Sequence, residues 1–134
     1  MIDIRWKQRF ENFEKAYNLL KEGLDLKIEN LSNLEKEGVI QRFEYTFELG
    51  WKTLKDYLEY QGIKASMTRD TIKEAFAAKI IDNGQAWIDM LEDRNLTSHT
   101  YDETKTNEIL EKINNFYFKE LKQVYNYLKG HLDE

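Results

Sequence analysis

The chain has 134 residues, of which 41% are hydrophobic and 34% are charged, and its net charge at pH 7 is −5. This length suits one domain with its own core and is too short for two ordinary ones, so we expect a single domain over residues 1–134. The acidic balance excludes nucleic-acid binding through a generally basic surface. No apolar run approaches the roughly 18 residues of a membrane span, so we expect a soluble protein without a membrane partner.

The N-terminal residues and the cysteine content bear on where the protein works. Residues 1–7 mix charged and apolar side chains and contain no apolar core of a secretion signal. We therefore expect a cytoplasmic protein. The chain has no cysteine, which removes disulfides and thiolate metal sites and leaves the redox compartment open.

Helical signals begin near the N-terminus, and strand signals are missing throughout. Proline is absent and only six glycines occur, so little interrupts long helices. The first predicted helix runs from about Asp3 to Gly23, with one apolar stripe at steps of three and four residues: Trp6, Phe10, Phe13, Tyr17, Leu20 and Leu24. A connector follows over residues 25–33, where Ser32 or Asn33 can cap the next helix.

The second predicted helix starts near Leu34 and ends at Gly62, which makes it about 40 Å long at ~1.5 Å per residue. Its main face carries Val39 or Ile40, Phe43, Phe47, Trp51, Leu54 and Leu58. Tyr45, Leu49 and Tyr57 widen this apolar surface beyond one stripe. We therefore expect this helix to be the spine of a bundle, packed against more than one neighbour.

Three further helices are predicted after Gly62. A short one begins at Thr68 as N-cap, with Asp70 in its first turn, and buries Ile72, Phe76 and Ile80. The fourth runs from about Gln85, with Trp87, Ile88 and Leu91 as its apolar face, and carries Arg94 in its last turns. Asp102, Thr104 and Thr106 compete to cap the fifth, which ends around residues 129–130 and buries Leu110, Ile113, Tyr117, Leu121, Val124 and Leu128.

These helices predict an all-α fold, an antiparallel up-and-down bundle of four main helices plus a short one. The apolar faces of the second, fourth and fifth helices are wider than one bundle needs to hide. We therefore expect a homodimer joined through long helices.

The residues best suited to chemistry are concentrated in the stretch Arg94-Asn95-Leu96-Thr97-Ser98-His99-Thr100-Tyr101. Arg94 offers a planar, permanently charged fork for a phosphate. His99, one of two histidines in the chain, titrates near neutrality and can act as a general acid or base. Asn95 and Tyr101 add polar groups beside them.

This spacing resembles the R-x4-H-x-Y signature of HEPN domains. The earlier stretch from Phe43 to Leu58, which reads Phe-Glu-Tyr-Thr-Phe-Glu-Leu-Gly-Trp-Lys-Thr-Leu-Lys-Asp-Tyr-Leu, resembles the helix of one HEPN branch, the nucleotidyltransferase substrate-binding proteins with their HepT-like toxins. The two stretches follow in the order and at about the separation typical of this branch. The resemblance therefore covers nearly the whole chain.

The resemblance implies a toxin-like partner of a minimal nucleotidyltransferase, the antitoxin of a HEPN/MNT pair, that cleaves RNA without a metal through attack by the 2′-hydroxyl. In that function Arg94 holds the phosphate, His99 transfers the proton and Asn95 is a hydrogen-bonding partner. It also implies nucleotidylation of Tyr101 by the partner, which silences the activity. The alternative function is a non-catalytic subunit that binds substrate or nucleotide for a separate nucleotidyltransferase.

The stretch also allows a purely structural interpretation. Arg94 then pairs with a nearby acid such as Asp89 or Asp102, His99 caps a helix end, and Tyr101 covers the entry to the fifth helix. On a regular helix the five-residue step from Arg94 to His99 rotates the two side chains by about 140°. They converge only if the helix unwinds before His99 or if the residues meet their counterparts across a two-fold axis.

Other candidates give weaker signals. No histidine has a metal-binding spacing and no glycine-rich phosphate loop occurs, so we expect neither a metal nor a cofactor, and not the nucleotidyltransferase itself. The charged run Glu48, Lys52, Lys55, Asp56 and Glu59 is most simply a solvated face, and His131 is expected to be exposed. A modest basic run, made of Lys64, Arg69, Lys73 and Lys79, is a candidate for local contact with RNA, although taken alone it is more simply a solvated helix face.

Overall fold

The structure, a computed structural model, describes residues 4–97 and 102–134. Within these ranges it contains helices and no strand, which confirms the all-α prediction. The helical elements, in chain order, are α1 (Arg5–Leu24), η1 (Ile28–Asn30), α2 (Asn33–Tyr60), α3 (Thr68–Ala77), α4 (Gly84–Thr97), α5 (Glu103–Lys112), η2 (Ile113–Tyr117) and α6 (Phe118–Lys129).

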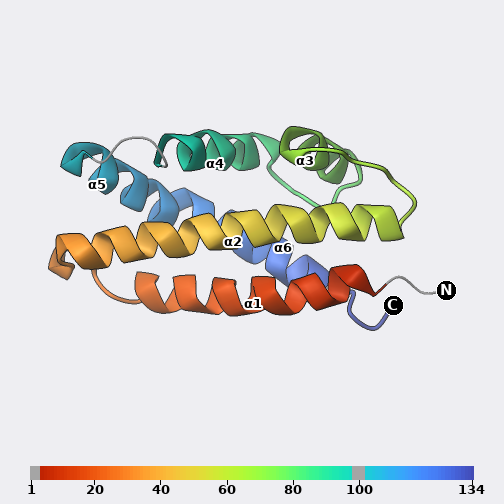
Figure 1. Cartoon of the computed structure of the whole chain (residues 1–134), viewed down its shortest axis with the longest axis horizontal. Coiled ribbons are helices and arrows are strands. Elements are labelled where there is room, and N and C mark those ends of the chain that lie inside the picture. Colours follow the sequence, from red (N-terminus) through yellow and green to blue (C-terminus); the bar gives the residue numbers. More distant parts are fainter. Residues whose placement is uncertain (1–3, 98–101) are drawn as a thin grey trace.

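The bundle is organised around α2, as predicted. Figure 1 shows α1 along one side of α2, α3 and α4 along the other, and the α5 to α6 segment crossing behind it. The buried side chains of these helices form one contiguous core. Among the described residues, no helix is both long and apolar enough to cross a membrane.

The pairing of α1 with α2 follows from the predicted stripes. The stripe residues of α1 from Trp6 to Leu20 are at most 4% exposed. On α2, Ser32 accepts a hydrogen bond from the Glu35 amide while the Glu35 side chain accepts one from the Ser32 amide, so a capping box starts the helix. The sequence had left the choice between Ser32 and Asn33 open, and Ser32 is the cap.

Gly50, in the middle of α2, allows its neighbours to approach the helix closely. A Cβ atom built at this position would lie 3.1 Å from Phe13 of α1 and 3.3 Å from Trp87 of α4. Both of these rings are fully buried. The glycine is therefore the point at which α2 is packed between α1 and α4, and a larger residue there would push one of the two helices away.

One residue of the charged run on α2 was misassigned. Asp56 was predicted on a solvated face, but it is only 8% exposed and accepts a hydrogen bond of 2.7 Å from Nε of Arg9 on α1. The periodicity of α2 alone could not reveal this, because the partner comes from another helix. The rest of the run forms helical pairs, Lys52 with Glu48 at 3.3 Å and Lys55 with Glu59 at 2.8 Å.

The short helix α3 differs from the prediction at both ends. Thr68 is its first residue rather than its cap, and Met67 occupies the cap position without a side-chain hydrogen bond. Phe76 was predicted to be buried but is 53% exposed, and the neighbouring Ala75 is buried in its place. The helix ends at Ala77, where a positive φ of 64° at Lys79 reverses the chain and directs Ile80 into the core.

The last helical segment is continuous in direction but not regular. Asp102 caps α5 by accepting a hydrogen bond from the Thr104 amide at 2.8 Å, so of the three proposed caps Asp102 is the one used. The π-helical stretch η2 was not predicted. Its wider turn keeps Tyr117 in the core and leaves Phe116 57% exposed.

His131 was predicted to be exposed, and this is wrong. Its ring stacks on Tyr127 with centroids 4.2 Å apart, and its Nδ1 lies 2.6 Å from the Tyr127 carbonyl oxygen. The imidazole is therefore half-buried against the end of α6, where it also meets the edge of Tyr57.

Candidate functional site

The predicted site residues fall at the end of α4. Arg94 and Asn95 occupy its last turn, since the helix remains regular through Thr97. His99 and Tyr101 lie outside the described residues. The structure therefore describes the cationic half of the R-x4-H motif and its surroundings.

Arg94 is bound to α2. Its Nη2 donates to the Oε2 of Glu48, and both side chains are about 30% exposed. The structural interpretation had offered Asp89 or Asp102 as partners for Arg94, but the partner is Glu48. Asp89 instead accepts a hydrogen bond from Gln85, and Asp102 caps α5.

Glu48 lies between two cations. Besides Arg94, its carboxylate forms an ion pair with Nζ of Lys52, which lies 3.3 Å away and one turn further along α2. Arg94 in turn places Nη1 3.4 Å from Oδ1 of Asn95, a long contact that brings the two predicted residues together. The guanidinium is therefore held in place from two directions.

A second carboxyl lies beside this pair, one turn earlier on α2. Glu44 is half-buried, and burial raises its pKa above the ordinary value, opposed by the Thr97 hydroxyl and by the charge of Arg94. The Thr97 hydroxyl donates a hydrogen bond to the Arg94 carbonyl oxygen at 2.9 Å. Glu44 can therefore hold a proton at a higher pH than a solvated glutamate.

The last turn of α4 is fastened from its other side by Asp93. This residue is 7% exposed, accepts a hydrogen bond from the hydroxyl of Tyr117 in η2, and lies 3.3 Å from Nζ of Lys112. Burial, followed by the hydrogen bond to Asp93, raises the pKa of Tyr117, so the phenol remains a donor. Asp93 therefore fixes the backbone from which Arg94 projects.

Sequence reasoning missed these supporting residues in different ways. Glu44 and Glu48 were present in the quoted stretch, and their four-residue spacing puts them on one side of α2, but nothing in the sequence said that α4 would lie there. Tyr117 had a signal that went unused, because it is a hydroxyl-bearing residue in an otherwise aliphatic stripe and needs a partner when buried. Its position depends on η2, which has no recognised sequence signature.

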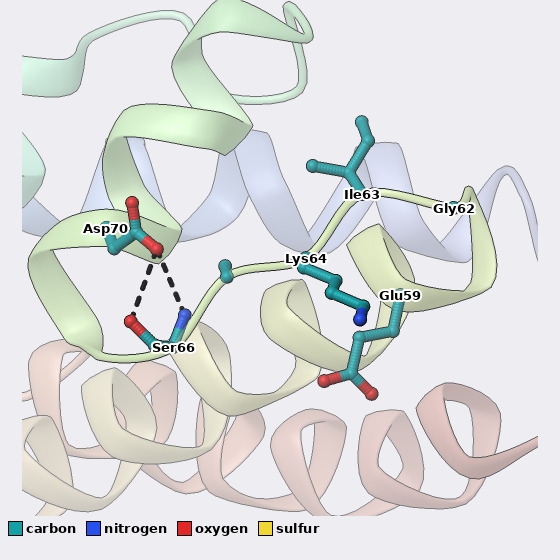
Figure 2. Close-up of a pocket in the computed structure, with 7 residues that line it drawn as sticks. Glu59, Gly62, Ile63, Lys64, Ser66 and Asp70 are labelled. Atoms are coloured by element: carbon teal, nitrogen blue, oxygen red, sulfur yellow. Dashed lines mark hydrogen bonds between the residues drawn. The ribbon is translucent and has the colours of Figure 1, made fainter.

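A separate cavity of about 530 Å³ lies at the junction of α2 and α3. It is lined by residues 62–66 together with Glu59 and Asp70 (Figure 2). Figure 2 shows the Ser66 amide and hydroxyl directed at the Asp70 carboxylate, at 3.0 and 3.4 Å, which orders the loop. Glu59 is eleven residues beyond Glu48, about 16 Å along the helix axis, so this cavity is remote from Arg94.

The described residues contain no group of three His, Cys, Asp or Glu side chains arranged to hold a metal ion. The site around Arg94 consists of a cation, the Asn95 amide and two carboxyls, those of Glu44 and Glu48. Such a set can bind an anion and exchange protons.

Comparisons with known proteins give consistent results. The family model described as "Nucleotidyltransferase substrate binding protein like" matches residues 8–130. The chain is 33% identical over 84 residues to a protein of Haemophilus influenzae named "Probable ribonuclease HepT", and this match spans 59% of the chain and 58% of that protein. A crystal structure of a protein from Thermus thermophilus shares 34% identity with a TM-score of 0.79, covering 87% of this chain and 98% of that one.

Proposed function

Because the chain belongs to the nucleotidyltransferase substrate-binding protein-like family, in its HepT-like HEPN branch, we propose that it is a metal-independent endoribonuclease and the toxin-like partner of a minimal nucleotidyltransferase. The observation that carries the proposal is the presentation of Arg94. The residue sits on the last turn of α4, held by Glu48 and Asn95, five positions before His99.

The described contacts suit Arg94 for binding a scissile phosphate. A substrate phosphate competes with Glu48 for the guanidinium, and this exchange does not leave Glu48 unpaired because Lys52 remains beside it at 3.3 Å. Asn95, in contact with the same guanidinium, can hydrogen-bond a phosphate or ribose oxygen. Arg94 therefore binds the phosphate from a prepared position.

The reaction is an internal transfer of the phosphoryl group. The 2′-oxygen forms a bond to phosphorus as the bond from phosphorus to the 5′-oxygen breaks, giving a 2′,3′-cyclic phosphate and a 5′-hydroxyl. The proton leaves the 2′-hydroxyl and one is delivered to the departing 5′-oxygen. His99 is the group that transfers the proton, and Arg94 stabilises the charge that accumulates on the phosphate oxygens.

A homodimer provides a way for Arg94 and His99 to converge. The five-residue step between them separates two side chains on a regular helix by about 140°, and α4 is regular through Thr97. Two large, exposed hydrophobic residues are sequence neighbours of site residues: Tyr45 follows Glu44 and is 53% exposed, and Leu96 follows Asn95 and is 51% exposed. We place the two-fold contact over these residues, so that the motifs of two copies line one cleft.

Regulation is assigned to Tyr101. The partner nucleotidyltransferase transfers AMP from ATP, forming a bond between the phenol oxygen and the α-phosphorus while pyrophosphate leaves. The added phosphate supplies Arg94 with an anion and excludes the substrate phosphate. Mass spectrometry after incubation with the partner and ATP should show AMP-sized additions that Tyr101→Phe loses, and modification of Tyr101→Phe to the same extent would place the acceptor elsewhere.

The alternative function, a non-catalytic substrate- or nucleotide-binding subunit, has one observation in its favour. Arg94 already has a carboxylate partner in Glu48, as an arginine with a structural role would. Such a subunit has no need of a proton-transferring histidine beside the arginine, and for that reason we prefer the ribonuclease.

The two functions are separated by an RNA cleavage assay in the presence of EDTA. Arg94→Ala and His99→Ala should each be inactive when alone. When mixed so that heterodimers form, they should recover part of the activity if Arg94 of one copy works with His99 of the other. Cleavage that EDTA abolishes, or that survives in both single variants, would contradict the proposal.

A further inference from the structure

Two rows of side chains face each other across the groove between α3 and α4. On α3, Arg69, Lys73 and Phe76 are spaced by four and three residues and share one helix face, which is exposed. On α4, Ile88, Glu92 and Asn95 have the same spacing. Arg69 and Glu92 approach to 3.5 Å, so the two rows adjoin.

A cavity of about 470 Å³ lies in this groove. Ile72, Lys73 and Phe76 of α3 line one side, and residues 82–85 with Ile88 line the other. The two isoleucines provide an apolar floor. Among the described residues that line it, Lys73 is the one cation and Asp82 the one acid.

Phe76 is held in this cavity with half of its surface uncovered. A Cβ atom built on Gly84 would lie 3.2 Å from the Phe76 ring, so the glycine allows the ring to rest against the backbone at the start of α4. The side chain nevertheless remains 53% exposed. An aromatic ring fixed on one side and open on the other is a surface on which a flat ligand can stack.

The remaining lining groups fit the edge of a nucleobase. The Nε2 group of Gln85 donates a hydrogen bond to Oδ1 of Asp89 at 2.9 Å, and Oδ1 of Asn83 accepts one from the Ala86 amide at 3.0 Å. Both side chains are therefore held in defined positions. Each amide carries donor and acceptor atoms beyond those used in these bonds. The Asp82 carboxylate can accept from an exocyclic amino group, and Lys73 can contact a phosphate.

The row of side chains on α4 continues from the cavity toward the candidate active site. Asn95, at the far end of the row on α4, contacts Arg94. Ile88, which lines the cavity, precedes Asn95 by seven residues, about 10 Å along the helix axis. A single RNA strand can therefore place one nucleotide in the cavity and a nearby phosphate at Arg94.

From this arrangement we propose that the cavity between α3 and α4 binds one unpaired nucleobase of the RNA strand, close to the phosphate that is cleaved. Phe76 stacks on the base, and Lys73 and Arg69 contact the neighbouring phosphates. The proposal rests on the ribonuclease function and extends it, because it makes α3 the element that selects single-stranded RNA. The cavity volume of about 470 Å³ is in the range of small-molecule sites and suits one base better than the broad flat surface that a protein partner covers.

The test measures binding of a short fluorescent single-stranded RNA to the full chain carrying His99→Ala, so that the RNA is not consumed. Phe76→Leu, which keeps an apolar side chain and removes the aromatic face, should weaken binding about tenfold, in line with the stacking energy of one base. Phe76→Trp should retain it. The matched control is Phe116→Leu, since Phe116 is similarly exposed at 57% but lies on η2 outside this groove.

Equal RNA binding by the Phe76→Leu and parent proteins would overturn the proposal, as would an equal loss in Phe116→Leu. A Phe76→Leu variant that binds RNA normally but no longer binds the nucleotidyltransferase would show that the groove serves a protein instead. The result also separates the two levels of the account. If cleavage does not depend on Phe76, the base-binding subsite is refuted and the ribonuclease function is not. If RNA binding depends on Phe76 but the parent protein cleaves no RNA, the ribonuclease function is refuted and the subsite is not.

Discussion

Arg94 in the last turn of α4 is bound through its guanidinium to Glu48 in the middle of α2. Each side chain is about 30% exposed, so solvent screens the pair and it contributes little to the free energy of unfolding. Its importance lies in position. The pair holds the Arg94 guanidinium beside Asn95 and Glu44. Arg94 can still exchange Glu48 for a substrate phosphate, because Lys52 also neutralises Glu48.

The packing at Gly50 gives a prediction about stability. Gly50→Ala should lower the free energy of unfolding by about 1–3 kcal/mol, because the new methyl group meets the buried rings of Phe13 and Trp87 at 3.1 and 3.3 Å. Gly38→Ala in the same helix is the control. No atom lies within 4 Å of its added Cβ, so it should stabilise the protein by about 0.5–1 kcal/mol. Urea denaturation measures both, and equal effects would show that the contact at Gly50 is absent.

The hydrogen bond between Tyr117 and Asp93 gives a second prediction. Tyr117→Phe removes the donor from a carboxylate that is 7% exposed and should cost about 1–3 kcal/mol of unfolding free energy. Tyr60→Phe is the control, since Tyr60 is the last residue of α2 and takes no part in the hydrogen bond to Asp93. If the site depends on this anchor, Tyr117→Phe should also slow RNA cleavage. A variant as stable as the parent would exclude Asp93 as the anchor of α4.

The carboxyl of Glu44 gives a prediction about pH. Burial raises its pKa above the ordinary value of 4.5, so the folded protein binds this proton more tightly than the unfolded chain does. The stability that Glu44 contributes is therefore fully present below its ordinary pKa and is lost as pH rises through the folded value. Glu44→Gln should become more stable relative to the parent between pH 4 and pH 7, as measured by urea denaturation across this range.

Glu14 provides the opposite case. The Tyr125 hydroxyl, at 2.5 Å, lowers the pKa of Glu14, so its contribution is present at neutral pH and is lost as pH falls through the folded value. Glu14→Gln should therefore be less stable than the parent at neutral pH, and the difference should vanish in acid. If the two variants respond to pH in the same direction, the assignment of whichever carboxyl departs from its predicted direction is refuted.

Regular periodicity predicted most of the fold. The stripe on α1 and the length of α2 were correct because three- and four-residue steps persist over many turns, and Gly62 and Ser32 mark the ends of α2. Prediction failed where tertiary contacts decide the outcome. Phe76 lies on an outer edge of a helix of only ten residues, and the smaller Ala75 takes the buried position.

The candidate site was predicted only in part. Arg94 and Asn95 could be chosen from the sequence because few side-chain types bind phosphate. In the structure the two side chains contact each other. The acids around them could not be predicted, because Glu48 and Asp56 occur in the same charged run and differ only in which helix packs against them. The first meets Arg94 of α4 and the second meets Arg9 of α1.

The central claim is that Arg94 holds the scissile phosphate, and the most direct test is the RNA cleavage rate of Arg94→Lys in the presence of EDTA. Lysine keeps the charge but lacks the planar fork, so we expect a rate at least tenfold below the parent, with unfolding free energy unchanged within about 1 kcal/mol. Arg42→Lys, at an exposed arginine bound to the Leu19 carbonyl oxygen, should cleave at the parental rate. Parental cleavage by Arg94→Lys, or no cleavage by the parent protein itself, would contradict the account.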